Sequence, residues 1–314
     1  MKTLTKRPAA RPSSPPLEPV RYPRLAELLA DQARGEGFSS SRMPGVKFMR
    51  STQFVPRTQI AYEPSIVIVA QGRKSGYLAG KKFVYDANQF LVLAMPLPFE
   101  CETEGSPDEP LLGLSISVTP ASVSELLMHV EQPVAGDDAP QAIQSHPVDD
   151  PLGDAATRLA EALRSNNDAR ILGPQIVREI TYRVLCGPLG QNLRALAAPH
   201  THFGQISRVM TKLNNDFALP HDLPSLAREA GMSVSTFHAH FKTITSFSPL
   251  QYLKNVRLHK ARMLMVHEGI NAGNAALEVG YESASQFSRE FKRLFGGSPA
   301  TVTQKLRDSL IRLS

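Results

Sequence analysis

The 314-residue chain lacks several features that would place it in other protein classes. It has no tryptophan and only two cysteines, Cys101 and Cys186. Two cysteines do not form a disulfide framework, so we expect a protein of a reducing, cytoplasmic compartment. No apolar run approaches the ~20 residues that span a bilayer, so we expect no membrane partner. Residues 1–24 lack the apolar segment of a signal peptide.

Histidine is also missing from the first 128 residues, since His129 is the first in the chain. Iron, manganese or zinc sites in β-barrel enzymes need two or three histidines and a carboxylate. We therefore expect no metal and no cofactor. Cys101 lies between Glu100 and Glu102, whose negative charges disfavour a reactive thiolate. An inert Cys101 is the expectation, and a role in sensing oxidants or electrophiles is the alternative.

Charge is distributed unevenly along the chain. Residues 1–24 carry 6 Lys/Arg against 1 Asp/Glu, residues 25–200 carry 15 against 20, and residues 201–314 carry 14 against 8. We interpret the first segment, which is also rich in proline, as a disordered basic tail. The basic C-terminal part suits a polyanionic partner such as DNA, because Lys and Arg near phosphates supply sequence-independent binding.

A repeat of about 50 residues occupies that basic C-terminal part. Its small residues recur at an offset of 49, and its Phe, Lys, Ser and Pro residues recur at an offset of 50. The first copy contains Ala227-x3-Gly231, Phe237-x3-Phe241-Lys242 and Ser248-Pro249, and the second contains Ala276-x3-Gly280, Phe287-x3-Phe291-Lys292 and Ser298-Pro299.

This spacing predicts two helix-turn-helix units. Ala227 and Ala276 allow two helices to cross closely, and Gly231 and Gly280 tolerate the positive φ of a tight turn. The second helices then begin at good N-cap residues, since Ser233 opens the first and Ser283 with Gln286 has the form of a capping box. The phenylalanine pairs are spaced i,i+4 and point into the core. The second copy has one extra residue in its turn.

These residues resemble the AraC/XylS family of bacterial transcription regulators over about residues 206 to 308. The motifs that carry the resemblance are Ser248-Pro249-Leu250-Gln251-Tyr252-Leu253, Arg257-Leu258-x2-Ala261-Arg262, Val279-Gly280-Tyr281-Glu282-Ser283 and the run from Ser285 to Arg293. The resemblance implies that one long helix, about Ser248 to His267, holds both recognition helices on the same side, roughly one DNA turn (~34 Å) apart. Where the family usually has glycine after the first recognition helix, this chain has Ser246, and we expect mild strain there.

The resemblance also implies which residues contact double-stranded DNA. The base-contact positions are Ser235, Thr236, His238 and Ala239 in the first unit, and Ala284, Ser285, Gln286, Ser288 and Arg289 in the second. Arg289 suits a bidentate contact to guanine and Gln286 a contact to adenine, whereas Ala239 has only a methyl group for thymine. The phosphate-contact candidates are Arg208, Lys242, Lys254, Arg257, Lys292 and Arg293.

The chain before residue 120 shows short apolar runs divided by turns, which predict an antiparallel barrel or sandwich. We expect strands at 66–70, 74–78, 82–85, 90–94 and 111–118, with a hairpin at Ala79-Gly80. Helices are expected at 121–129, at 154–165 and from Pro174 to Cys186. Aromatic residues that could line a ligand pocket are Phe54, Tyr62, Tyr77, Tyr85, Phe90 and Phe99.

This half resembles the N-terminal domain of one AraC-family subgroup over roughly residues 25–195. The matching residues are Tyr62-x-Pro64-Ser65-Ile66-x-Ile68-x3-Gly72-Arg73-Lys74, Asp86 to Leu93, Leu97-Pro98 and Leu172-Gly173-Pro174-x3-Arg178-Glu179-Ile180-x-Tyr182-Arg183. The resemblance implies an α+β protein: a cupin-like antiparallel β-barrel with flanking helices, followed by an all-α domain with two helix-turn-helix units. We divide the chain into the tail at 1–24, an effector or dimerisation domain at 25–165, a helical linker at 166–205 and a DNA-binding domain at 206–310.

The predicted function is therefore a sequence-specific DNA-binding regulator that is not an enzyme. A small-molecule effector, a second copy of the chain in a homodimer, and RNA polymerase are further candidate partners. Two alternatives stay open from sequence: a cupin-type enzyme with an appended DNA-binding domain, and a dimeric DNA-binding protein that needs no ligand. The effector-binding residues are not identified at this point.

Overall fold

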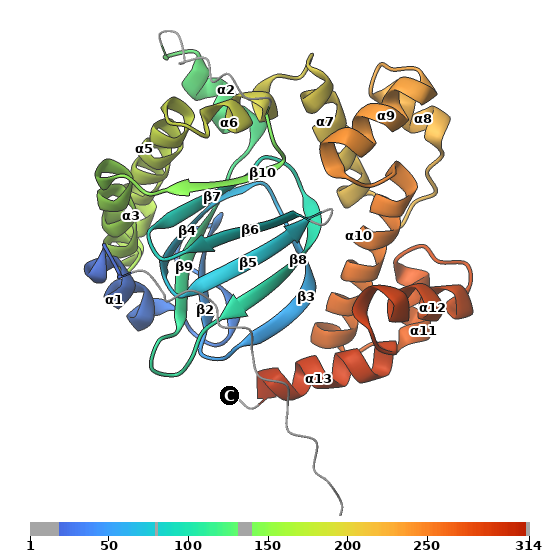
Figure 1. The fold of residues 1–314 in the computed structure, drawn as a ribbon, viewed down its shortest axis with the longest axis horizontal. Helices are drawn as coiled ribbons and strands as arrows, with labels where there is room; N and C mark the ends of the chain where they lie inside the picture. The colour runs from blue at the N-terminus through green and yellow to red at the C-terminus, as the bar shows by residue number, and fades with distance from the viewer. Residues whose placement is uncertain (1–18, 79–80, 131–139, 312–314) are drawn as a thin grey trace, which may run out of the picture.

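The computed structural model describes residues 19–78, 81–130 and 140–311. Two facing β-sheets form its centre, with helices against one side and a second group of helices, arranged around α10, on the other (Figure 1). The strands are β1 Gly37–Ser40, β2 Val46–Ser51, β3 Val55–Tyr62, β4 Ser65–Gln71, β5 Arg73–Leu78, β6 Lys81–Asp86, β7 Gln89–Leu93, β8 Leu97–Glu104, β9 Leu111–Ser117 and β10 Ile143–Pro147. The helices are α1 Pro23–Gln32, α2 Pro120–Leu127, α3 Asp150–Ala162, α4 Asn166–Ile171, α5 Gly173–Cys186, α6 Gly190–Ala197, α7 His202–Asn215, α8 Leu223–Glu229, α9 Val234–Thr245, α10 Pro249–Met263, α11 Ala272–Glu278, α12 Ala284–Phe295 and α13 Pro299–Ile311, with a π-helical turn η1 Leu264–Glu268.

All described strand pairs are antiparallel. One sheet has the order β1-β2-β9-β4-β7-β10 and the other the order β3-β8-β5-β6. The first sheet is centred on β4, where Ile66 pairs with Ile116 on one side and Val92 on the other. The α+β class is confirmed, and the described strands form two open sheets rather than one closed ladder.

Strand β4 has a continuous run of apolar residues from Ile66 to Ala70, and the structure shows why. Ile66 and Ile68 pack into the core beneath the N-terminal helices, whereas Val67 and Val69 point into the space between the sheets. A strand covered on both faces needs apolar residues at every position, so alternation disappears. Helix α1 supplies part of the outer cover, since Leu25, Leu28 and Leu29 are buried in the same core as Ile66.

The expected strands and helices between residues 65 and 186 are confirmed, with small shifts at their ends. Helix α3 begins at Asp150, four residues before its predicted start, because Asp149 caps it by accepting a hydrogen bond from the Leu152 amide at 2.9 Å. Strands β1, β2, β3, β8 and β10 and helix α1 were not predicted. The expected hairpin at Ala79-Gly80 and the tail at 1–18 lie outside the described residues. No helix in the described ranges is long and apolar enough to cross a membrane.

The C-terminal helices pack in two clusters. Phe237 and Phe241 of α9 are fully buried in a core that continues into the space between the sheets. Phe287 and Phe291 of α12 belong to a separate, smaller core. Helix α10 contributes to both cores and therefore joins them. The predicted boundary at residue 206 falls inside α7, which runs from His202 to Asn215.

Candidate nucleic-acid interface

The first helix-turn-helix unit is formed by α8 and α9. Ala227 is buried where the helices cross, and Gly231 has a φ of +67° in the turn. The turn closes with a hydrogen bond of 2.9 Å from the Met232 amide to the Ala227 carbonyl. Ser233 then caps α9 by accepting from the Thr236 amide. The conformations predicted for the small residues and the N-cap are confirmed.

The second unit, α11 and α12, repeats this turn. Ala276 is buried, Gly280 has a φ of +81°, and the Tyr281 amide donates to the Ala276 carbonyl at 2.9 Å. A Cβ atom at Gly280 would lie 2.3 Å from the Ala218 carbonyl oxygen, so this position requires glycine both for its φ and for close approach. Ser283 caps α12 from the Gln286 amide. The reciprocal half of the predicted capping box is wrong, since the Gln286 side chain bonds to Glu290 at 3.2 Å.

Both recognition helices end in the left-handed conformation. Gly296 follows α12 with a φ of +74°, and Ser246 follows α9 with a φ of +67°. The two residues occupy equivalent places, and each donates its backbone amide to a Lys carbonyl four residues earlier. A side chain in this region of φ/ψ space is strained relative to glycine. The strain expected at Ser246 is therefore present in the structure.

Replacing Ser246 with glycine is expected to increase the free energy of unfolding by about 0.5–1 kcal/mol, because glycine adopts this conformation without the steric penalty of a Cβ. Urea unfolding of the full chain measures the change. Gly296→Ser is the matched control, since nothing lies within 4 Å of a Cβ built there, and it should destabilise by a similar amount. A less stable Ser246→Gly protein would contradict the interpretation.

Most predicted base-contact side chains lie on open surface. Those that are exposed are Ser235, Thr236, His238, Ala239, Ala284, Ser285 and Arg289, and those that are half-buried are Gln286 and Ser288. In each unit the N-cap serine hydroxyl also lies within 3.1 Å of the serine hydroxyl two residues on. The face opposite the phenylalanine pairs is thus available for a large partner, and base contact by these residues stays a prediction.

A hydrogen-bonded cluster around Glu290 connects α12 with α10. The Glu290 carboxylate accepts from Lys254 Nζ at 2.7 Å, from the Tyr281 hydroxyl at 2.8 Å and from Gln286 Nε2 at 3.2 Å. Burial raises the pKa of Glu290, but these three donors outweigh it and hold the pKa below its usual value. Lys254 and Gln286 therefore position α12 in this structure. The signal for this contact in the sequence is the i,i+4 spacing of Gln286 and Glu290.

Arg257 connects the two units through backbone carbonyls. Its Nε donates to Phe217 at 2.7 Å, one terminal nitrogen to Gly280 at 2.9 Å and the other to Leu219 at 2.9 Å. Phe217 and Leu219 belong to the segment between α7 and α8, and Gly280 is the turn of the second unit. Three of its five N–H donors are therefore held by carbonyls, which gives Arg257 a structural role, and its contact with phosphate stays a prediction.

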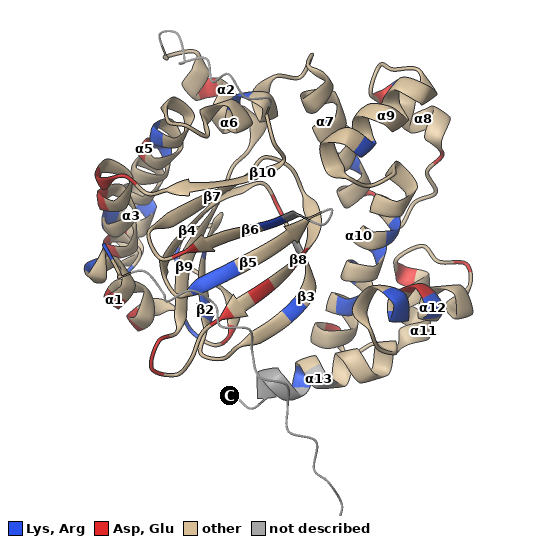
Figure 2. Cartoon of the chain, in the orientation of Figure 1, with Lys and Arg blue, Asp and Glu red and all other residues tan. Residues whose placement is uncertain are grey.

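The remaining phosphate-contact candidates are exposed: Arg208, Lys242, Lys292 and Arg293. Arg208 donates to the Glu229 carbonyl at 3.2 Å, which is a weak restraint on an exposed side chain. Lys and Arg outnumber Asp and Glu on α10 and α12, whereas Asp and Glu outnumber them on α1 and α3 (Figure 2). The positive charge predicted from composition therefore lies among the helix-turn-helix elements.

Comparisons with known proteins agree with this geometry in both halves. Residues 42–192 match the family described as AraC-type transcriptional regulator N-terminus, and residues 226–305 match a helix-turn-helix domain family. The HTH-type transcriptional activator RhaS of Klebsiella pneumoniae is 28% identical over 152 residues, which cover 48% of this chain and 53% of RhaS. RhaS of Salmonella paratyphi B is 31% identical over 108 residues, covering 34% and 38% of the two chains. The chain thus spans between 38% and 53% of the length of these relatives.

Solved structures show the same arrangement of domains. An apo ToxT variant from Vibrio cholerae aligns with a TM-score of 0.56 at 12% identity, over 85% of this chain and 98% of ToxT. Wild-type ToxT with a bound unsaturated fatty acid aligns with a TM-score of 0.55 at 12% identity, over 85% and 96%. The two family matches and the RhaS relatives, rather than the fold alone, identify the chain as a member of the AraC/XylS family. Its N-terminal sheets lie in the part that matches the AraC-type N-terminus, and both helix-turn-helix units lie in or beside the part that matches the helix-turn-helix domain.

In this AraC/XylS-family chain the two-sheet domain packs directly against α10. The Tyr252 hydroxyl donates to the Pro96 carbonyl at 2.8 Å, and Arg262 donates to the Gln59 carbonyl at 3.0 Å. His259 is buried between them, and burial together with the nearby Arg262 lowers the pKa of His259 well below its ordinary value. The helix that holds both recognition helices is therefore also the helix that the sheets contact.

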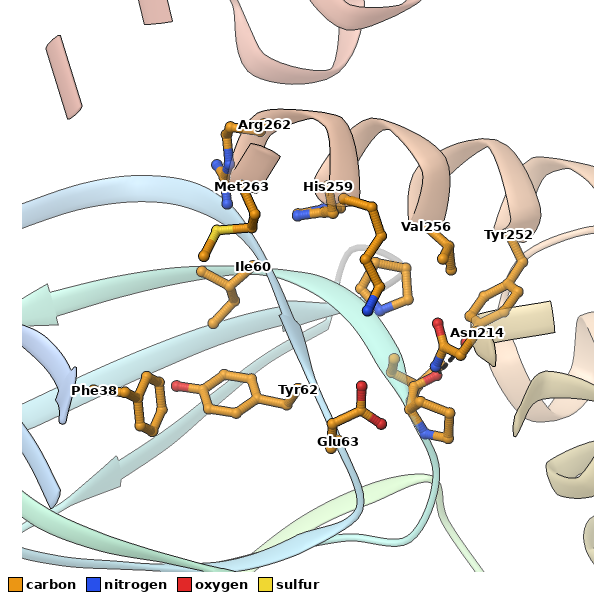
Figure 3. A pocket seen from close by; sticks show the side chains of 14 residues that line it. Phe38, Ile60, Tyr62, Glu63, Asn214, Tyr252, Val256, His259, Arg262 and Met263 are labelled. Carbon is orange, nitrogen blue, oxygen red and sulfur yellow. Dashed lines mark hydrogen bonds between the residues drawn. The ribbon is translucent and has the colours of Figure 1, made fainter. Parts of the chain in front are cut away.

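A cavity of about 300 Å³ lies along this contact (Figure 3). Phe38, Ile60 and Tyr62 line it from the strands, while His259 and Met263 line it from α10. Of the aromatic residues predicted to line a pocket, Tyr62 does so. The prediction is wrong for Phe90, which packs into the core beneath the N-terminal helices.

The described residues contain no cluster of three or more His, Cys, Asp or Glu side chains that could hold a metal. Cys101 is buried, and its Sγ lies 3.4 Å from the Tyr85 hydroxyl. The inert role expected for Cys101 stays a prediction.

Proposed function

We propose that this chain is a sequence-specific DNA-binding transcription regulator in which α9 and α12 enter successive major-groove segments. One observation carries the proposal: two helix-turn-helix units, each with a positive-φ glycine in its turn and a serine N-cap on its second helix, are held on one helix by Arg257 and the Glu290 cluster. A pair of units fixed in this way presents two recognition surfaces at a defined spacing, as a bipartite DNA site requires.

We further propose that the two-sheet domain regulates DNA binding through α10. Tyr252 and Arg262 connect that domain to the helix that carries both units. A ligand that binds the docked arrangement better than any other shifts the population toward it and so changes DNA affinity. A ToxT structure of this fold contains an unsaturated fatty acid, which supports a small molecule as the regulator.

The other partners follow from the function and are part of the same proposal. The matched families are transcription regulators, so we assign the sheets a regulatory rather than a catalytic role. A homodimer formed through the N-terminal half would bind two half-sites. RNA polymerase is the partner expected if the protein activates transcription, as RhaS is named to do. All of these partners place the protein in the cytoplasm.

The test is selection of preferred sites from random DNA with the full-length protein at physiological salt. Two conserved blocks about one helical turn (~34 Å) apart are expected, because each recognition helix reads one groove segment. A Ser235→Ala, His238→Ala double variant should blur one block and leave the other intact. Enrichment of no motif would contradict the proposal, and a single block unaffected by the double variant would restrict sequence reading to α12.

A further inference from the structure

Glu290 is a largely buried carboxylate in the middle of the second recognition helix. Its side chain is 13% exposed, and both of its oxygens accept hydrogen bonds. Oε1 accepts from Lys254 Nζ at 2.7 Å and from Gln286 Nε2 at 3.2 Å, and Oε2 accepts from the Tyr281 hydroxyl at 2.8 Å. A negative charge on a helix that enters a DNA groove repels the phosphates, so its presence on α12 requires an explanation.

The first helix-turn-helix unit folds without a carboxylate at this place. At the offset of 50 residues that relates the two units, His240 stands where the second unit has Glu290. The His240 ring lies against the ring of His202 from α7, with the centroids 3.8 Å apart. The first unit nevertheless has its positive-φ glycine and its serine N-cap. A buried carboxylate is therefore not a requirement for building such a unit, and the purpose of Glu290 is sought in what it holds.

Gln286 is the partner of Glu290 that lies nearest to the start of α12. It belongs to the first turn of this helix, and the N-terminal residues of a recognition helix are the ones that reach base edges. Gln286 is half-buried, and its Nε2 donates to Glu290. Its Oε1 has no hydrogen-bond partner among the described residues and is open to solvent. The Gln286 amide is thus held by its nitrogen, and its oxygen is free to accept.

The charge of Glu290 decides which end of this amide is free. Burial raises the pKa of Glu290, but its three hydrogen-bond donors hold the pKa below its usual value, so the carboxylate is ionised at neutral pH. An ionised carboxylate only accepts hydrogen bonds, so an amide oxygen turned toward it meets repulsion. A glutamine without such a neighbour exchanges its oxygen and nitrogen by rotating its terminal torsion. Gln286 loses its contact with Glu290 if it does so.

We propose that Glu290 is a positioning residue that determines specificity: it fixes the Gln286 amide with its oxygen free, so that α12 selects a base that carries an amino group. Adenine suits this amide best, because its N6 donates to Oε1 and its N7 accepts the second N–H of Nε2, whereas cytosine offers only its N4 donor. Guanine and thymine place a carbonyl oxygen opposite Oε1 and are rejected. This inference rests on the proposed function, since it specifies how one recognition helix reads sequence.

The experiment is site selection from random DNA with the full-length protein, followed by titration of the preferred site and of altered sites. The base pair read by Gln286 is the one whose preference disappears in Gln286→Ala. At this position the wild-type protein should bind adenine at least about tenfold more tightly than guanine, as a bidentate base contact provides. In Glu290→Gln the ratio should fall to about threefold or less, because a neutral amide donates or accepts and lets Gln286 turn its nitrogen toward guanine.

Control variants separate this effect from charge and from folding. Glu278→Gln removes the same charge from an exposed site on α11, and it should keep the adenine preference. Glu290→Ala should relax the preference as Glu290→Gln does, and it removes the side chain instead of burying an amide. The double variant Glu290→Gln, Gln286→Ala should match Gln286→Ala at this base pair, because Glu290 acts only through Gln286. The base pair that loses its preference in Arg289→Ala should keep it in Glu290→Gln.

Four outcomes would overturn the inference. These are an adenine preference that survives both Glu290→Gln and Glu290→Ala, a wild-type motif with guanine or thymine at the Gln286 position, a motif that Gln286→Ala leaves unchanged, or equal loss of preference at the Arg289 base pair in Glu290→Gln. The last result would make Glu290 a structural residue of α12. If any of them occurs while the wild-type protein still selects a two-block motif, only the role of Glu290 fails. Absence of any wild-type motif would instead remove the proposed function.

Discussion

Arg257→Ala is expected to lower the free energy of unfolding of the C-terminal helices by about 2–4 kcal/mol, because it removes three hydrogen bonds from a charged donor and leaves three carbonyls without it. Those carbonyls belong to Phe217, Leu219 and Gly280, so the segment before α8 and the turn of the second unit lose their common anchor. Urea unfolding of the full chain, followed by circular dichroism, measures the loss. DNA affinity should fall for every sequence, because the spacing of α9 and α12 is no longer fixed.

Two variants separate this structural role from a phosphate contact. Arg257→Lys keeps the positive charge but cannot reach three carbonyls in fork geometry, so it should destabilise nearly as much as alanine. Lys260→Ala removes an exposed charge from the same helix, whose Nζ lies 5.5 Å from the Phe217 ring, and should change stability by less than about 1 kcal/mol. If Arg257→Lys instead keeps wild-type stability and DNA affinity, the charge alone matters and the phosphate contact predicted from sequence is supported.

Arg289→Ala is expected to lose about 1–3 kcal/mol of binding free energy for the preferred site and to relax the preference at one base pair. Arg289 is exposed on α12, between the buried Phe287 and Phe291 that orient the helix. Among the described residues no hydrogen bond or ion pair to the Arg289 side chain is found, so its guanidinium is available to contact a base edge. Repeating the site selection with the variant, and titrating wild-type and altered sites, measures both effects.

Arg293→Ala provides the comparison, because Arg293 is also exposed on α12 but is assigned to phosphate. It should weaken all sequences about equally and reduce the salt dependence of binding, with no change in the selected motif. The folding of α12 should be unaffected in both variants. A selected motif that is identical for Arg289→Ala and the wild type would remove Arg289 from the base-reading surface.

The helix-turn-helix units could be predicted from sequence because their determinants are local. Gly231 and Gly280 adopt the positive φ that their turns require, Ser233 and Ser283 cap the next helix, and the phenylalanine pairs are buried. Each of these requirements acts within one or two helical turns, so it is visible in the spacing of the chain. Ser246 is the same kind of case, since its left-handed conformation follows from its place after α9.

The order of the strands could not be predicted in the same way. Strand β4 pairs with β9 and β7, which are distant in sequence, and β3 joins the other sheet. Edge strands such as β1 and β10 carry too few apolar residues for alternation to reveal them. Their pairing depends on which edges remain free once the central strands have formed, and that is decided by packing of the whole domain.

The sequence by itself determined the family, the two recognition helices and the residues on their exposed faces, because these depend on periodicity and on short motifs. Only the tertiary structure decided that Arg257 anchors the two units and that Lys254 of α10 holds Glu290 of α12. The reason is physical: an arginine or lysine side chain has the same properties anywhere in a sequence. Whether it faces water, a carbonyl or an apolar cavity depends on segments that folding brings together from up to about 200 residues away, as Arg262 and Gln59 show.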